Sequence, residues 1–253
     1  MKMVFIVGAG GSAAGAVAFA RIDGRILTDE KCAAFVPAGR TPRGGECAPH
    51  CGGVMAASVL FVAAAYLMGS VSFAVVASKL FRLPDPRSYG SGNPGATNVL
   101  RTGNKAAAVV TLLGDGIKGW LAVWLAQRFG AQFGGADWTI PTVALAAFVG
   151  HLYPVFHRFA GGKGVATAAG IVAALHWPLA LVLGGVWLVL AYGFRISSLA
   201  ALVTAALMPI GMFYVMGNAP IAWTMIPIAV LLFWRHRNNI RQLLAGKERG
   251  IGR

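Results

Sequence analysis

The sequence predicts an all-α, polytopic integral membrane protein with about seven transmembrane helices. Of its 253 residues, 57% are hydrophobic and only 12% are charged, against about 25% charged residues in an average soluble domain. So few charged side chains cannot cover a globular surface in water, and the chain has room for several apolar stretches of about 20 residues each. These observations exclude disordered, coiled-coil and disulfide-scaffold proteins.

The first 53 residues differ from the rest and are predicted to form a separate N-terminal extension. An apolar run over 4–20 precedes a polar stretch without regular period, and this region holds all three cysteines. Their spacing and odd number predict neither a disulfide framework nor a zinc site. The apolar run suits a signal-like segment or an additional membrane segment. Alternatively, Met55 is the natural start, and the segment before it is an upstream over-extension of the reading frame; in either case the membrane domain is expected over 54–253.

Seven apolar segments follow this extension and are expected to cross the membrane. They cover residues 55–78, 106–127, 139–157, 164–176, 178–193, 197–215 and 219–235. The fourth and fifth segments are short and meet just before Pro178. This predicts a tight hairpin that spans a thinned part of the bilayer or is tilted in it. A second proline, Pro220, marks the turn between the sixth and seventh.

The loop charges predict the orientation of these spans. Most of the cations lie in alternate loops, whereas the other loops carry only Arg128. By the positive-inside rule, the membrane domain begins on the outer side and its C-terminus and active-site loops lie on the cytoplasmic face. Membrane orientation and anionic lipid headgroups also account for the formal net charge of +14, so the lipid bilayer, and no nucleic acid, is the expected partner.

A polar cluster follows the first span, within the sequence GSGNPGATNVLR at 90–101. Its glycines allow backbone N–H groups to converge on an anion. Ser91, Thr97 and Asn98 add neutral donors, and Arg101 can bind two phosphate oxygens with its planar guanidinium. The alternative is an ordinary Gly/Asn turn. The remaining candidate contacts in this cluster are Gly90, Gly92, Asn93 and Gly95.

A second cluster, GGKGVAT at 161–167, runs directly into a predicted helix. Gly161, Gly162 and Gly164 flank Lys163, and a helix N-terminus supplies free N–H groups for a phosphate. The spacing is not that of a Walker A motif, because a glycine stands where the Mg²⁺-binding hydroxyl belongs. The cluster therefore predicts phosphate binding without NTPase activity.

The remaining polar side chains form a third cluster and one pair. His236 and Asn239 lie one helical turn apart, so that they can share a face, and Glu248 follows. Within the second span, Asp115 and Lys118 are spaced to neutralise each other in lipid, which favours structural support over catalysis. Acids are scarce after residue 53, which argues against carboxylate-rich metal chemistry and against phosphatidyl transfer. We therefore expect phosphorylated substrates and no metal or cofactor.

Three motifs in order resemble the bacterial acyl-phosphate:glycerol-3-phosphate acyltransferases of the PlsY type, over roughly 55–253. They are GSGNPGATNVLR, then GHLYPVF leading into GGKGVAT, and finally HRNNI at 236–240. The resemblance implies a seven-helix enzyme of the bacterial inner membrane. It would acylate the first hydroxyl of glycerol 3-phosphate from acyl phosphate, releasing lysophosphatidic acid and inorganic phosphate in the first acylation of phospholipid synthesis. A soluble enzyme that produces acyl phosphate is then an expected functional partner.

The residue patterns and the resemblance together give each of these positions an expected role. Catalytic roles fall on Ser91, Arg101, Lys163, His236 and Asn239. Substrate or phosphate binding falls on Gly90, Gly92, Asn93, Gly95, Thr97, Asn98, Gly161, Gly162, Gly164 and Ser198. Structural support falls on Asp115, Lys118 and Glu248. Either the donor's own phosphate or His236, through a water, can accept the hydroxyl proton. The alternative function is a small anion or phosphate-ester transporter.

Overall fold

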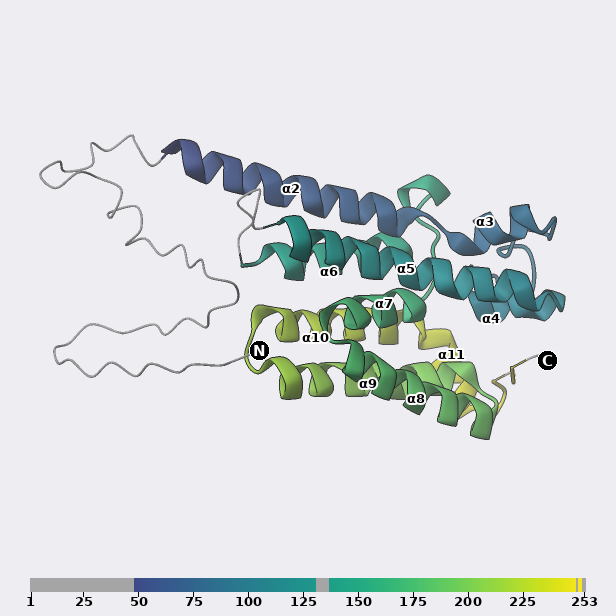
Figure 1. Cartoon of the computed structure of the whole chain (residues 1–253). Coiled ribbons are helices and arrows are strands. Elements are labelled where there is room, and N and C mark those ends of the chain that lie inside the picture. The colour runs from purple at the N-terminus through teal and green to yellow at the C-terminus, as the bar shows by residue number, and fades with distance from the viewer. Residues whose placement is uncertain (1–47, 131–136, 249, 252–253) are drawn as a thin grey trace, which may run out of the picture. The chain divides into compact units, whose positions relative to one another are not determined.

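The computed structural model describes residues 48–130, 137–248 and 250–251. These residues form helices joined by loops, without a strand among them, so the all-α prediction is confirmed (Figure 1). The predicted extension lies outside the described residues up to position 47. The first described helix, α2 (Ala48–Ser70), begins before the predicted domain boundary at residue 54.

The first predicted span is two helices rather than one. Helix α2 is followed by α3 (Phe73–Leu80), and the two helices bend by 42° at the break. Ser72 has extended backbone angles there, and Ser70 Oγ donates a hydrogen bond to Tyr66 O at 2.8 Å. The predicted span over 55–78 thus corresponds to a bent pair of helices, which together are long and apolar enough for one crossing.

The middle of the chain forms α5 (Lys105–Phe129), α6 (Thr139–Leu152) and α7 (Val165–Leu175). Helix α5 begins at Asn104, whose Oδ1 accepts a hydrogen bond from the Ala107 N–H at 2.9 Å. Helices α5 and α7 approach closely at two glycines, because a Cβ on Gly119 or Gly170 would collide with the backbone of the opposite helix. Small residues at helix crossings are typical of membrane bundles.

The C-terminal half forms α8 (Trp177–Phe194), α9 (Ser197–Met216), α10 (Pro220–Arg235) and α11 (Arg237–Leu244). Helices α7 and α8 are separated by His176 alone. Its Nδ1 accepts a hydrogen bond from the Leu179 N–H at 3.1 Å and thereby caps α8. The predicted tight hairpin between the fourth and fifth segments is confirmed.

Fewer helices reach full membrane-spanning length than the sequence predicts. Four of the described segments are long and apolar enough to cross a membrane: α5, α6 with its extension to His157, α8 and α9. The bent pair α2–α3 makes a fifth if it is counted as one span. Helices α7 and α10, with 11 and 16 residues, fall short of the roughly 20 needed for a perpendicular crossing. Seven crossings remain a prediction.

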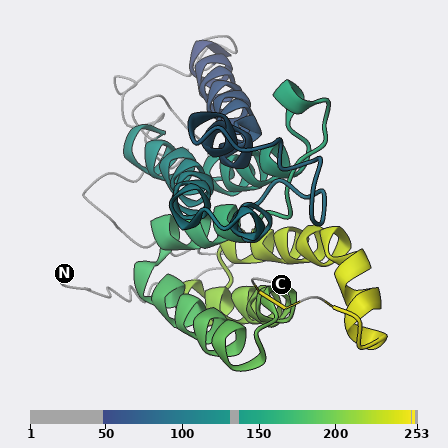
Figure 2. The same ribbon diagram turned by 90° about the vertical axis from the view of Figure 1, so that its right-hand side faces the viewer.

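In the membrane domain, α2, α3, α5 and α6 form one half, α8, α9 and α10 form the other, and α7 lies between them (Figures 1 and 2). The largest core cluster includes Phe148, Ile171, Met212 and Met225, which are fully buried. Helix α8 exposes large apolar side chains such as Leu181 and Val189, as expected of a lipid-facing helix. The end of the bundle that faces the viewer in Figure 2 carries α3, α11 and a short helix, α4 (Ala96–Val99).

Candidate active site

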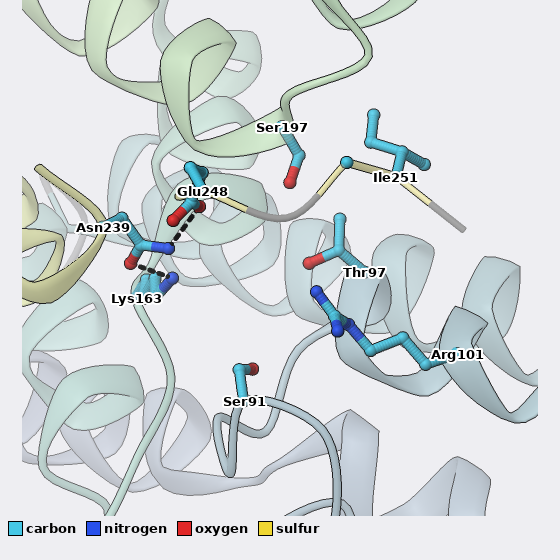
Figure 3. A pocket seen from close by; sticks show the side chains of 9 residues that line it. Ser91, Thr97, Arg101, Lys163, Ser197, Asn239, Glu248 and Ile251 are labelled. Carbon is cyan, nitrogen blue, oxygen red and sulfur yellow. Dashed lines mark hydrogen bonds between the residues drawn. The ribbon is translucent and has the colours of Figure 1, made fainter. Parts of the chain in front are cut away.

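A polar pocket lies at this end of the bundle and gathers residues from all three polar clusters (Figure 3). Residues from loops and helix ends up to 160 positions apart meet there. The lining residues are Ser91, Thr97, Arg101, Lys163, Ser197, Asn239, Glu248, Gly250 and Ile251. Four of the five predicted catalytic residues are therefore brought together, and His236 is not among them.

One wall of the pocket is a chain of short hydrogen bonds. Lys163 Nζ donates to Asn239 Oδ1 at 2.6 Å, and Asn239 Nδ2 donates to Glu248 Oε1, also at 2.6 Å (Figure 3). Ser198 Oγ donates to the same carboxylate oxygen at 2.6 Å. Because an amide both accepts and donates, Asn239 connects the cation to the carboxylate. Ser198, predicted as a binding residue, thus contacts the pocket wall rather than lining the pocket.

Burial of Lys163 lowers the pKa of its ammonium group. Desolvation is the main cause that lowers the pKa of its ammonium group, and the nearby cations Arg235 and Arg101 add to the shift, which brings the pKa to about 8. The carboxylate of Glu248 opposes this shift. Because burial makes the charged form of Lys163 costly, a bound anion would stabilise that form. Lys163 is therefore suited to bind a phosphate.

The opposite wall carries Ser91, Thr97 and Arg101, and the fold of its loop depends on Asn98 (Figure 3). The Asn98 Oδ1 accepts a hydrogen bond from the Ser91 N–H at 2.9 Å, and its Nδ2 donates to Pro86 O at 2.7 Å and Tyr89 O at 3.2 Å. With 2% of its surface exposed, Asn98 shapes the loop and does not reach the pocket. The prediction of Asn98 as a substrate contact is not supported.

The other predicted contacts of this loop also stay out of the pocket lining. Gly90 and Gly92 have φ angles of +61° and +66°, which only glycine adopts readily. Gly95 is the residue before α4, with extended backbone angles. Gly90 and Gly92 turn the chain, and neither these three glycines nor Asn93 are among the lining residues.

The second glycine loop, over 161–164, is fixed by hydrogen bonds to Arg235 and His151. Arg235 donates from Nε to Gly162 O at 3.0 Å and from Nη2 to Gly161 O at 2.5 Å, and the Gly162 N–H donates to His151 O at 3.2 Å. A Cβ on Gly161 or Gly162 would collide with His151. The Gly162 N–H is thus used inside the protein, and of this loop only Lys163 lines the pocket.

The last glycine of that loop, Gly164, has a φ angle of +85° and directly precedes α7. A Cβ there would collide with the Phe148 ring. The position therefore requires glycine both for its backbone conformation and for packing, and it does not line the pocket.

His236 does not line the pocket, although Asn239 does. Its side chain is 2% exposed, and Nδ1 lies 2.8 Å from Leu232 O. Because a carbonyl only accepts hydrogen bonds, Nδ1 carries the proton. Burial, and then the charges of Lys163 and Arg235, lower the pKa of His236 to about 4, against the opposing effect of the bond to Leu232. The ring is neutral near pH 7, and of this pair only Asn239 lines the pocket.

Asp115 and Lys118 pair as their spacing predicted. The Lys118 Nζ lies 2.8 Å from Asp115 Oδ1, and each side chain is only 4% exposed. His151 Nδ1 lies 3.6 Å from the same oxygen. None of these residues lines the pocket. Elsewhere in the described ranges, no group of three or more His, Cys, Asp or Glu side chains is arranged to hold a metal ion.

Sequence reasoning missed several residues of the site. Ser197, Gly250 and Ile251 line the pocket, and Arg235 holds the glycine loop. The C-terminal segment is held there because the Ile251 N–H donates to Arg195 O at 2.7 Å. The sequence could have indicated Arg235, because this residue directly precedes the third motif. Gly250 and Ile251 could not have been predicted, because no local sequence pattern indicates that the C-terminal segment packs against the pocket.

Comparison with known proteins agrees with this geometry. A family model described as glycerol-3-phosphate acyltransferase matches residues 59–246. The glycerol-3-phosphate acyltransferase of Cupriavidus pinatubonensis is 61% identical over 198 residues, which are 78% of this chain and 97% of that protein. The enzyme of the same name from Ralstonia nicotianae is 60% identical over 196 residues, 78% of this chain and 95% of that one.

Solved structures show the same fold. The crystal structure of PlsY, an integral membrane glycerol 3-phosphate acyltransferase, in its glycerol 3-phosphate form has a TM-score of 0.71 and 38% identity, covering 77% of this chain and 96% of that chain. The lysophosphatidic acid form of PlsY gives a TM-score of 0.70 and 37% identity, covering 76% and 94%. By sequence and by fold, this multi-pass membrane protein belongs to the glycerol-3-phosphate acyltransferase family.

Proposed function

We propose that this chain transfers a fatty acyl group from acyl phosphate to the first hydroxyl of glycerol 3-phosphate, giving lysophosphatidic acid and inorganic phosphate. The observation that carries the proposal is a pocket with two cations and three hydroxyls at the polar end of an apolar helix bundle. The relatives are named for glycerol 3-phosphate, and the PlsY structures are of its glycerol 3-phosphate and lysophosphatidic acid forms. These names support the acceptor and the product.

Some of the pocket residues are suited to bind the phosphate group, and others are suited to bind the hydroxyl groups of glycerol 3-phosphate. Arg101 presents a planar set of donors that matches phosphate oxygens, and Lys163 adds a compact charge. The hydroxyls of Ser91, Thr97 and Ser197 donate to, or accept from, the remaining oxygens. Glu248 Oε2 is buried and has no hydrogen-bond partner among the described residues, so it is a free acceptor for a substrate hydroxyl.

The reaction requires little from the protein beyond positioning and charge. The hydroxyl oxygen attacks the acyl carbon, an ester bond forms, and the bond from that carbon to the bridging phosphate oxygen breaks. Phosphate leaves with the bonding electrons and takes the hydroxyl proton. Arg101 and Lys163 stabilise the charge that develops on the leaving phosphate, while binding orients the hydroxyl.

The surroundings of His236 favour the donor's phosphate as the base. The imidazole is buried, its Nδ1–H bonds to Leu232 O, and its lowered pKa makes it a weak base. It also does not line the pocket. We therefore assign His236 to the packing of the third motif, close to Asn239.

We place the pocket on the cytoplasmic face of a bacterial inner membrane, with the membrane domain beginning on the outer side. The pocket end of the bundle carries Lys79 on α3 and Arg237 and Arg241 on α11, in agreement with the positive-inside rule. A soluble enzyme that makes acyl phosphate would deliver the donor to this face. The acyl chain then stays among apolar helices while the headgroups react at the interface.

We further propose that residues 54–253 contain the whole acyltransferase, with 1–53 as a separate extension. The match to the family begins at residue 59, and every pocket residue lies after that position.

Purified protein in detergent tests the function directly. With palmitoyl phosphate and glycerol 3-phosphate, in the presence of a chelator, we expect phosphate and lysophosphatidic acid in equal amounts. Omitting the acceptor should abolish phosphate release, and palmitoyl-CoA should not replace palmitoyl phosphate. Phosphate release without acceptor would indicate a hydrolase. Glycerol 3-phosphate uptake into protein-containing vesicles, without any lysophosphatidic acid, would favour the transporter.

A further inference from the structure

A buried ion pair lies against the break between α2 and α3. The Lys118 Nζ donates to Val71 O at 2.6 Å, and Asp115 Oδ1 accepts from the Phe73 N–H at 3.4 Å. A helix break leaves backbone donors and acceptors unpaired, and the membrane interior offers no water to satisfy them. Lys118 supplies a donor for the free Val71 carbonyl, and Asp115 supplies an acceptor for the free Phe73 N–H. The hydrogen-bonding groups of the helix break and of the ion pair therefore have partners inside the protein.

The same segment of α5 also contacts the second glycine loop, from two directions. Thr167, in the first turn of α7, donates from Oγ1 to Asp115 O at 2.9 Å. His151 lies with Nδ1 3.6 Å from Asp115 Oδ1, and its carbonyl accepts from the Gly162 N–H. The His151 ring also occupies the space in which a Gly162 side chain would stand. Asp115 is thus connected to Thr167, which follows Lys163 in the chain, and through His151 to Gly162, which precedes it.

We infer that Asp115, Lys118, His151 and Thr167 form a buried support that positions the glycine loop, and with it the Lys163 ammonium group. These are positioning residues, because none of them lines the pocket. The support extends the role of the ion pair from neutralising two charges to fixing the second glycine loop. The inference rests on the proposed function for its kinetic readout.

Thr167→Val is the sharpest test, because it keeps the branched shape and removes only the hydroxyl. Loss of the hydrogen bond between α7 and α5 should raise the KM for glycerol 3-phosphate roughly fivefold with little change in kcat. Thr111→Val is the matched control. Thr111 is equally buried, and its hydrogen bond to Ala107 O stays within α5, so the KM of this variant should stay at the wild-type value.

The double variant Asp115→Asn with Lys118→Met removes both charges together, which avoids leaving one buried and unpaired. Asn keeps an acceptor for Phe73, whereas Met leaves Val71 O without a donor. We expect a larger rise in KM than for Thr167→Val, at a melting temperature still high enough to assay. If this variant does not fold, the two threonine variants decide the question alone.

Two outcomes would overturn the inference. One is an unchanged KM in Thr167→Val, and the other is an equal change in both threonine variants, which would indicate a general loss of stability. Binding of inorganic phosphate, measured by calorimetry, gives a second readout that does not need turnover. A wild type that binds phosphate without transferring acyl groups would refute the proposed function, while weaker phosphate binding in Thr167→Val alone would still support the inference.

Discussion

The two glycine-rich loops of the pocket look alike in sequence but use glycine for different physical reasons. In the first loop, Gly90 and Gly92 have positive φ angles and turn the chain. In the second, Gly161 and Gly162 are needed because His151 occupies the space of a side chain. Backbone conformation therefore restricts Gly90, Gly92 and also Gly164, whereas at Gly161 and Gly162 the restriction is one of volume alone. A glycine motif alone does not distinguish these two requirements.

The loops also share one feature that the phosphate-loop pattern does not suggest. Each brings polar side chains to the pocket, with Ser91 from the first loop and Lys163 from the second. The N–H groups of Ser91 and Gly162 are bonded to Asn98 and to His151 O instead. We therefore expect phosphate binding to depend on the side chains that these loops place in the pocket.

The largest expected effect comes from removing the cation that each wall contributes. Lys163→Ala and Arg101→Ala should each lower kcat/KM roughly 10- to 100-fold, because a charge-assisted contact to phosphate is lost. Lys163→Arg and Arg101→Lys keep the charge and serve as controls for its geometry. Steady-state kinetics on protein that elutes as a single species would check this. Near-wild-type turnover at low substrate concentration would remove that residue from the phosphate site.

Gly162→Val should show the volume requirement of the second loop. The new side chain would collide with the His151 ring and Pro94 O, so the loop must move. We expect a rise in the KM for glycerol 3-phosphate of at least tenfold and a lower melting temperature. Gly184→Ala, on α8 with open space around it, is the control. An unchanged KM in Gly162→Val would reduce the loop to a connector.

Asn98→Ala should test what holds the first loop. The change removes three hydrogen bonds and leaves Pro86 O, Tyr89 O and the Ser91 N–H without this partner, at a cost of about 1–3 kcal/mol. We expect a lower melting temperature and a weaker kcat/KM, because Ser91 loses its position. Asn98→Asp, which retains an acceptor for Ser91, should fall between the wild type and Asn98→Ala. Full activity in Asn98→Ala would mean that the loop holds its shape without this side chain.

The pH dependence should report Lys163 in the second loop. Its ammonium group, with a pKa of about 8, is charged below that pH and neutral above it, so kcat/KM should fall as the pH rises through about 8. In Lys163→Arg the side chain stays charged, and the decline near pH 8 should disappear. A decline that persists in the arginine variant would assign it to another group.

The smallest effect is expected from starting the chain at Met55. This change leaves both glycine loops and all pocket residues in place, although it removes the first residues of α2. Specific activity per inserted molecule should match that of the full chain, as measured in membranes with the protein quantified by immunoblot. Reduced insertion alone would indicate a targeting role for the extension. Lower activity per molecule would show that the extension takes part in turnover.

The sequence alone determined the features that depend on local composition and spacing. Apolar length predicted the helices, i,i+3 spacing predicted the pair of Asp115 and Lys118, and charge with glycine content singled out Arg101 and Lys163. These signals are local because helix formation and the cost of charge in lipid act on neighbouring residues. Asn239 was also found, since it lies within the same motif as His236.

Only the tertiary structure decided how those features are used. The break at Val71 is stabilised by Lys118, 47 positions away, and no local pattern marks it. His236 and Asn239 are near neighbours in sequence, yet His236 is buried with its ring bonded to Leu232 of α10, whereas Asn239 lines the pocket. Arg235 reaches back to Gly161 across 74 positions. Such contacts depend on which surfaces meet when the helices pack, and that is a property of the whole bundle.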